Sequence, residues 1–139
     1  MNKVNNILMI LLMSTLSLWS ADMSDEMKKQ NQKVVTLFVQ EMSDQLPQKI
    51  DRFTTLKEIK GETQRIDYIF EINIGSKSDA QVIKEDHSRM KEAVTLGICK
   101  TSIRFLEAEI AIRYIYLSAQ SHKELFHFDV SQADCLKER

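Results

Sequence analysis

The sequence is poor in glycine and proline, and this scarcity excludes several kinds of site. Its three glycines, Gly61, Gly75 and Gly97, are scattered along 139 residues. No phosphate-cradling loop can be built from glycines so far apart. The single proline, Pro47, predicts that a preceding helix ends near Leu46.

The sequence also lacks the patterns that mark common metal centres and hydrolases. It contains no HExxH motif and no paired CxxC, and its three histidines are His87, His122 and His127. A metal site needs converging ligands, and a serine hydrolase of the nucleophile-elbow type needs a motif that is missing here. We therefore expect surface histidines, with no metal, no cofactor and no enzymatic activity.

Neither sign of charge dominates. There are 19 lysines and arginines against 20 aspartates and glutamates. Loss of the first twenty residues would remove only Lys3 and leave a net charge of about −2. This balance argues against broad electrostatic attraction to nucleic acid, while a local charged patch stays open.

The longest apolar run lies at the start of the chain. Residues 1–20 carry the single charge of Lys3, an apolar stretch runs from Ile7 to Trp19, and charges resume at Asp22. This pattern is typical of a secretory signal peptide, and the run is short for a span of about 20 apolar residues. We predict a cleaved signal peptide and a periplasmic location. An uncleaved N-terminal anchor is the alternative.

The two cysteines, Cys99 and Cys135, both follow the predicted signal peptide. An even number of cysteines in an exported chain favours a disulfide. For a loop of this length, the chain-entropy model gives a stabilisation of roughly 3–4 kcal/mol. Two buried free thiols are the alternative. A disulfide would remove the thiolate that a cysteine nucleophile requires.

Apolar periodicity predicts the elements of the remaining chain, which we read as a polar lead-in over residues 21–33 and a single domain over residues 34–139. Strict alternation from Arg65 to Ile74 indicates a half-buried strand. A helix starting at Ser78 or Asp79 would bury Ile83 and stop near Gly97. The other expected elements are a helix from residue 34, strands at 53–59, 110–117 and 124–130, a turn at 60–63, and a short helix at 100–108.

This order of elements predicts an α+β fold. Two hairpins with helical segments between them suggest a four-stranded antiparallel sheet with helices packed on one face. The element order would be α-β-β-α-(short α)-β-β. Periodicity alone does not set the order of strands in the sheet.

The side chains that would point away from these helices include several apolar ones. We expect Ile69, Ile115, Leu117 and Leu125 on the outer face of the sheet. If they adjoin one another, they form an apolar patch of the kind that binds a protein or peptide partner. Coverage of the patch by a helix is the alternative. An exposed edge strand could also accept a partner's strand.

Several local features match one known group of proteins. They are Gln45-Leu46-Pro47, the strand Tyr68-Ile69-Phe70, Cys99, the strand Tyr114-Ile115-Tyr116, and Asp134-Cys135. This layout resembles the small disulfide-bonded pilotins of type II secretion, the AspS-type group, and related exported two-cysteine domains of unknown function. The resemblance spans roughly residues 34–135 and implies a Cys99–Cys135 bridge.

Pilotins of that group bind a short segment of the outer-membrane secretin and help it reach its membrane. They are usually lipoproteins, whereas this chain has no cysteine just after its predicted signal peptide. The resemblance implies a non-enzymatic periplasmic binding or assembly protein that holds a partner peptide, a secretin or another envelope protein on an apolar surface. The alternative is an exported inhibitor or immunity-type protein that presents the loop Ser118 to Lys123.

Overall fold

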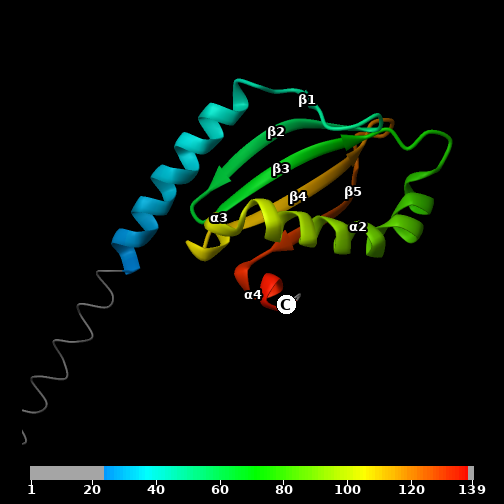
Figure 1. Cartoon of the computed structure of the whole chain (residues 1–139). Coiled ribbons are helices and arrows are strands. Elements are labelled where there is room, and N and C mark those ends of the chain that lie inside the picture. Colours follow the sequence, from blue (N-terminus) through cyan, green and yellow to red (C-terminus); the bar gives the residue numbers. More distant parts are fainter. Residues whose placement is uncertain (1–23, 138–139) are drawn as a thin grey trace, which may run out of the picture.

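A computed structural model of the chain describes residues 24–137, and the predicted signal peptide lies outside them. A long N-terminal helix occupies residues 24–43 (Figure 1). Among the described residues, no helix is long and apolar enough to cross a membrane. The elements that follow are β1 (Gln48–Lys49), β2 (Thr54–Glu62), β3 (Arg65–Ile72), α2 (Asp79–Thr101), α3 (Ile103–Glu107), β4 (Ala111–Ser118), β5 (Glu124–Val130) and α4 (Gln132–Leu136).

The predicted α+β class is confirmed, but the predicted sheet is wrong in two respects. The sheet has five strands in the order β1-β2-β3-β4-β5, because β1 pairs with β2 over two residues. A strand this short has no readable periodicity. The sheet is also not purely antiparallel, since β3 and β4 run parallel, with Tyr68 beside Tyr114. The chain crosses from β3 to β4 through α2 and α3, and parallel neighbours require such a crossover.

Two helix boundaries differ from the expected ones. Residues 24–33, expected as a polar lead-in, are helical and continuous with the helix that follows. Helix α2 does not stop at Gly97 but continues to Thr101. A glycine inside a helix costs only about 1 kcal/mol relative to alanine, so the packing of α2 outweighs it. The start of α2 is as expected, because Ser78 caps it in a capping box with Gln81.

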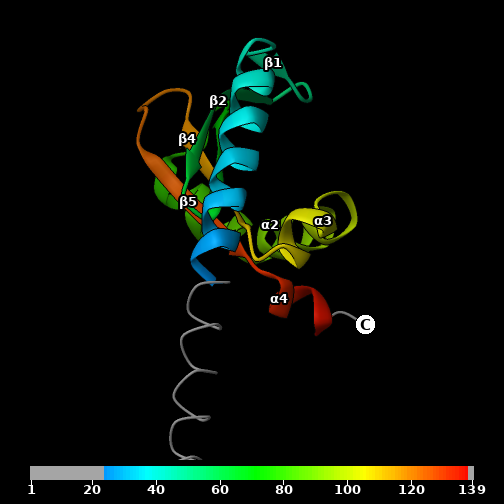
Figure 2. The ribbon, with the colours of Figure 1, turned by 90° about the vertical axis from the view of Figure 1, so that its left-hand side faces the viewer.

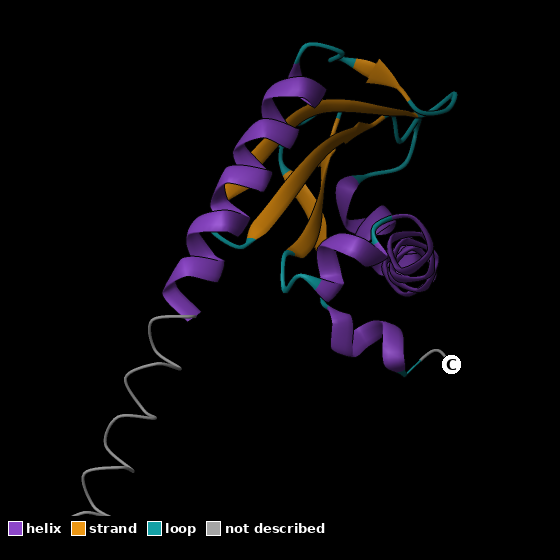
Figure 3. Cartoon of the chain, turned by 60° about the vertical axis from the view of Figure 1, so that its left-hand side comes forward, coloured by secondary structure: helices purple, strands orange, loops and turns teal. Residues whose placement is uncertain are grey.

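The described helices contact one face of the sheet, as predicted. The N-terminal helix reaches this face through Phe38, whose ring centroid lies 6.5 Å from that of Tyr68. Helix α2 reaches the same face at the other side, where His87 lies 5.3 Å from the ring of Phe128. Figure 2 shows α3 to one side of the N-terminal helix, and Figure 3 shows the two long helices separated across the sheet.

The N-terminal helix approaches the sheet closely at Gly61. A Cβ atom at Gly61 would lie 2.6 Å from Cγ1 of Val35 and 3.3 Å from Cγ2 of Val39. Gly61 belongs to strand β2 and not to the predicted turn. Its lack of a side chain makes room for the helix. Farther along the helix, the amide of Asn31 donates to the Ala108 carbonyl over 2.8 Å.

The two cysteines join the C-terminal end of the domain to α2. Cys99 of α2 and Cys135 of α4 form a disulfide, with their Cα atoms 5.5 Å apart. At about 100° per residue, Cys99 lies on the far side of α2 from Gly97. The bridge thus holds α2 from one side and leaves the other side of the helix facing the sheet.

Candidate functional site

The sheet face that points away from the helices holds three of the four predicted partner-binding residues. Ile69 and Ile115 are direct neighbours across β3 and β4, and Leu117 follows on the same face of β4. All three are half-buried. Leu125 is only 5% exposed and lies where the pairing of β4 with β5 is irregular. The predicted patch is therefore smaller than expected, and binding of a partner there stays a prediction.

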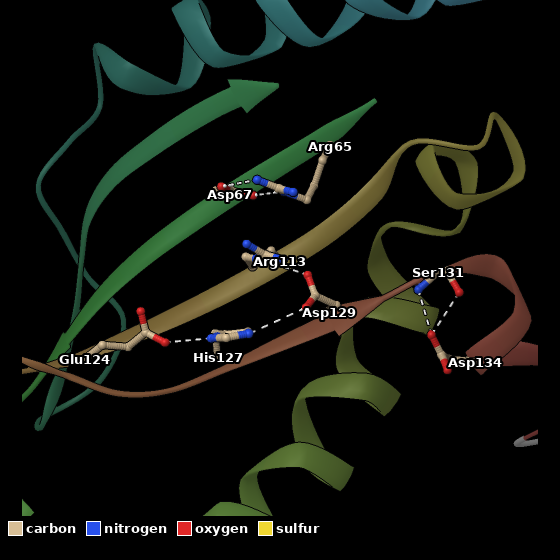
Figure 4. Close-up of polar contacts among 8 residues, drawn as sticks. All are labelled: Arg65, Asp67, Arg113, Glu124, His127, Asp129, Ser131 and Asp134. Atoms are coloured by element: carbon tan, nitrogen blue, oxygen red, sulfur yellow. Dashed lines mark hydrogen bonds and ion pairs between the residues drawn. The ribbon is translucent and has the colours of Figure 1, made fainter. Parts of the chain in front are cut away.

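Ion pairs surround these apolar residues and make the outer face largely polar (Figure 4). Arg65 donates to both carboxylate oxygens of Asp67, over 2.6 and 3.1 Å. The Nε atom of Arg113 lies 2.6 Å from Oδ1 of Asp129. Each of these cations is matched by a carboxylate, so the face presents little uncompensated charge to a ligand.

The three histidines lie apart. His87 packs edge-on against Phe126, and His122 places its Nδ1 atom 3.5 Å from Glu71. His127 lies between two carboxylates, with its Nδ1 atom 2.6 Å from Glu124 (Figure 4). Within residues 24–137, no group of three or more metal-ligating side chains is placed to hold an ion.

A groove of about 570 Å³ opens on the other face of the sheet, between the N-terminal helix and α2. Aromatic side chains of the two central strands form its floor. The rings of Phe70 and Tyr116 stack with centroids 5.0 Å apart, and the ring of Tyr114 lies 5.1 Å from that of Tyr68. Leu56 from β2 completes this floor.

The walls of the groove come from the two long helices. Met42 contributes from the N-terminal helix, while α2 contributes Met90, Ala93, Val94 and Gly97. The small residues Ala93 and Gly97 leave space along this wall, and a Cβ atom at Gly97 would meet nothing within 4 Å. The groove is therefore open along α2 and has room for a chain segment beside the helix.

The floor tyrosines give the groove a polar component. Burial raises the pKa values of Tyr68, Tyr114 and Tyr116, so all three hydroxyls stay protonated at neutral pH. None of the hydrogen bonds within residues 24–137 involves these hydroxyls, and no fully buried polar side-chain atom there lacks a partner. The hydroxyls are thus accessible from the groove and can both donate and accept.

One end of the groove is formed by the loop between β1 and β2. Ile50 is 51% exposed and lines the groove, and Phe53 is 53% exposed on the same loop. The guanidinium of Arg52 stacks over the Phe53 ring at 4.7 Å. Exposed apolar side chains at the mouth of an apolar groove extend the surface that a partner could contact.

Sequence reasoning missed this groove. Its signal was the paired aromatic positions Tyr68, Phe70, Tyr114 and Tyr116, which the alternation assigns to a buried face. Whether helices close over such a face or leave it open depends on their spacing. The sequence pattern does not report that spacing.

No protein-family model matches the sequence, and no curated protein is significantly similar to it. Solved structures do match. A proposed secreted protein from Pseudomonas aeruginosa superposes with a TM-score of 0.68 and 11% identity, over 78% of this chain and 96% of that one.

Two pilotins match almost as well. The type 2 secretion pilotin EpsS from Vibrio vulnificus gives a TM-score of 0.63 at 13% identity, over 80% of this chain and 96% of its own. The type II secretion pilotin AspS from Vibrio cholerae gives 0.61 at 12% identity, over 81% and 98%. The fold that the sequence resemblance implied is confirmed: this chain is similar in fold to the pilotins of type II secretion.

Proposed function

We propose that the chain is a non-enzymatic assembly protein of the cell envelope, pilotin-like, which holds a segment of a partner protein in the groove between the N-terminal helix and α2. The aromatic groove carries this proposal. It is apolar on its floor and open along one wall, and its polar groups are hydroxyls, an amide and the single carboxylate of Asp51.

The shape of the groove suits a peptide. Helix-in-groove recognition places the apolar face of a partner helix against a hydrophobic floor. Here two helices flank an aromatic floor, and the low wall at Ala93 and Gly97 would admit a third helix beside α2. Aromatic rings and methionines at the centre, such as Tyr116 and Met90, are typical anchors of a binding surface.

The resemblance to pilotins names the partner to test first, which is the outer-membrane secretin of the same organism. The Cys99–Cys135 disulfide agrees with a periplasmic location, because disulfides persist in oxidising compartments. Cleavage of a signal peptide within the first residues is part of the same proposal.

The proposal can be tested with synthetic peptides tiled across that secretin and titrated into the purified protein by calorimetry. We expect one peptide to bind, and Val94→Glu to weaken it roughly tenfold or more, because a charge would enter the apolar site. Val94 is only half-buried, so this variant should still fold.

The matched control is Ile115→Glu, which makes a similar change on the outer face of the sheet. Under the groove proposal this variant binds like the wild type. If only Ile115→Glu loses peptide binding, the binding surface is instead the predicted patch around Ile69. Absence of binding by every secretin peptide would remove the secretin as partner.

The loop at residues 118–123, considered above as an inhibitory loop, is tied back to the domain. Ser121 donates to Asp79 at the start of α2 over 2.6 Å. The amides of Gln120 and Ser121 donate to the hydroxyl of the buried Ser118. No observation here favours the inhibitor over the assembly protein.

A further inference from the structure

The groove has one charged lining residue within the described chain, and it stands at the end formed by the loop between β1 and β2. This residue is Asp51. Its Oδ1 atom accepts hydrogen bonds from the amides of Phe53 and Thr54, over 2.7 and 2.8 Å. These bonds fix the direction of the carboxylate and, led by the bond from Phe53, lower its pKa, so the group is ionised at neutral pH.

No cation of the described chain neutralises this carboxylate. No ion pair within residues 24–137 includes Asp51. The adjacent Arg52 turns its guanidinium onto the Phe53 ring instead. The exposed carboxylate therefore stands without a counter-charge from residues 24–137 at the end of an apolar groove. On the outer face of the same sheet, by contrast, Arg65 and Arg113 are both matched by carboxylates.

A second polar group lies next to this end of the groove. The Tyr116 side chain is only 6% exposed, yet its hydroxyl makes no hydrogen bond within the described residues. Tyr116 pairs with Phe70, which pairs in turn with Leu56 near the start of β2, and Tyr116 and Asp51 line the same groove. A hydroxyl that is accessible from the groove and has no protein partner can bond to a group that fills the groove.

We propose that the partner segment held in the groove carries a lysine or arginine beside its apolar anchors, and that this cation binds at Asp51 against the rings of Tyr114 and Tyr116. This inference rests on the proposed function. Three features support the assignment: a carboxylate without a counter-charge, an aromatic floor that attracts cations through its ring faces, and a hydroxyl that can orient the bound group. An acidic or purely apolar segment would leave the Asp51 charge uncompensated.

The test begins with a library of random peptides displayed on phage and selected on the purified protein and on its Asp51→Asn variant. Asparagine keeps the oxygen that accepts from Phe53 and Thr54 and removes only the charge. We expect apolar peptides with an added lysine or arginine from the wild type. From the variant we expect the same apolar pattern without that cation.

A selected peptide and its Lys→Gln or Arg→Gln form then complete a double-mutant cycle by calorimetry. Either change alone should weaken binding about two- to fivefold, the range for an exposed ion pair, and the second should add almost nothing to the first. Asp44→Asn is the matched control, since Asp44 is an exposed aspartate outside the groove lining, and it should leave the affinity unchanged.

The outcomes separate the two proposals. The role of Asp51 would be overturned if the selected peptides bind in the groove but are not enriched in lysine or arginine. It would also be overturned if the losses of binding free energy from the two changes simply add in the cycle. Either result would leave the groove proposal standing. Selection of no peptide that Val94→Glu weakens would overturn the groove as a peptide site, and the cation inference with it.

Discussion

Single residues on the groove floor combine two opposed properties. Tyr68 and Tyr114 are half-buried and Tyr116 is almost fully buried, and each carries a polar hydroxyl into an apolar site. A phenylalanine would fill the same space without the free-energy cost of placing a hydroxyl in an apolar site, as Phe70 does beside them. Tyrosine at these positions is consistent with a surface that is exposed in the free protein and covered in a complex.

Stability at alkaline pH tests the burial of these tyrosines. Burial raises the pKa of each above the value of about 10 that holds in an unfolded chain. The folded state therefore favours the protonated phenol, and this contribution is fully present below pH 10 and is lost as the pH rises toward the raised pKa.

We accordingly expect the free energy of unfolding, measured by urea denaturation, to fall as the pH rises above about 10. Other groups also titrate in this range, so the comparison is with Tyr68→Phe. In this variant the free energy of unfolding should fall less steeply with pH, because one of the titrating phenols is missing. An identical pH profile in the two proteins would contradict the raised pKa of Tyr68.

At the scale of helices and strands, the sequence predicted those elements that show a local alternation of apolar and polar residues. The strand from Arg65 is found within two residues of its expected end, and β5 has the expected bounds. The parallel pairing of β3 with β4 was missed, because it depends on the path of the crossover. Ile83, expected to be buried, is 41% exposed, while its neighbour Val82 is 4% exposed. Two adjacent apolar residues do not reveal which way a helix is rotated.

The candidate site was less predictable than the fold. The predicted residues Ile69 and Ile115 do meet across two strands, as alternation requires. The groove instead depends on where the two long helices rest, and one contact that sets this is the bare backbone at Gly61 against Val35. Nothing in the periodicity distinguishes this glycine from one in a turn.

The same substitution at two glycines should have opposite effects on stability. Gly61→Ala places a methyl group 2.6 Å from Val35 and should destabilise the domain by roughly 1–3 kcal/mol. Gly97→Ala adds a methyl group in open space within a helix and should stabilise it by about 0.5–1 kcal/mol. Denaturant unfolding of both variants measures the difference. Equal effects would show that the helix does not rest on Gly61.

For the whole molecule, the covalent link matters more than any single contact. The disulfide closes a loop that contains α3, β4 and β5, with Cys99 and Cys135 separated by 36 positions. A bridge over such a loop stabilises chiefly by restricting the unfolded chain. Figure 1 shows α4 below α2, to which the bridge links it.

Replacement of both cysteines by serine should therefore lower the free energy of unfolding by roughly 2–4 kcal/mol. Thiol labelling of the purified native protein should find no reactive cysteine, and labelling after denaturation should find two only when a reductant is added. Two reactive thiols in the denatured, unreduced protein would show that the bridge is absent and would reopen cysteine chemistry.

The position of the bridge has a consequence for timing. Helix α2 carries the disulfide on one side and a wall of the groove on the other. In a chain that is synthesised in a reducing compartment and exported, this wall is braced only after oxidation. If the chain is exported and binds a peptide as proposed, the groove would be complete only in the oxidising compartment, and a partner made in the same cell would find this wall unbraced before export.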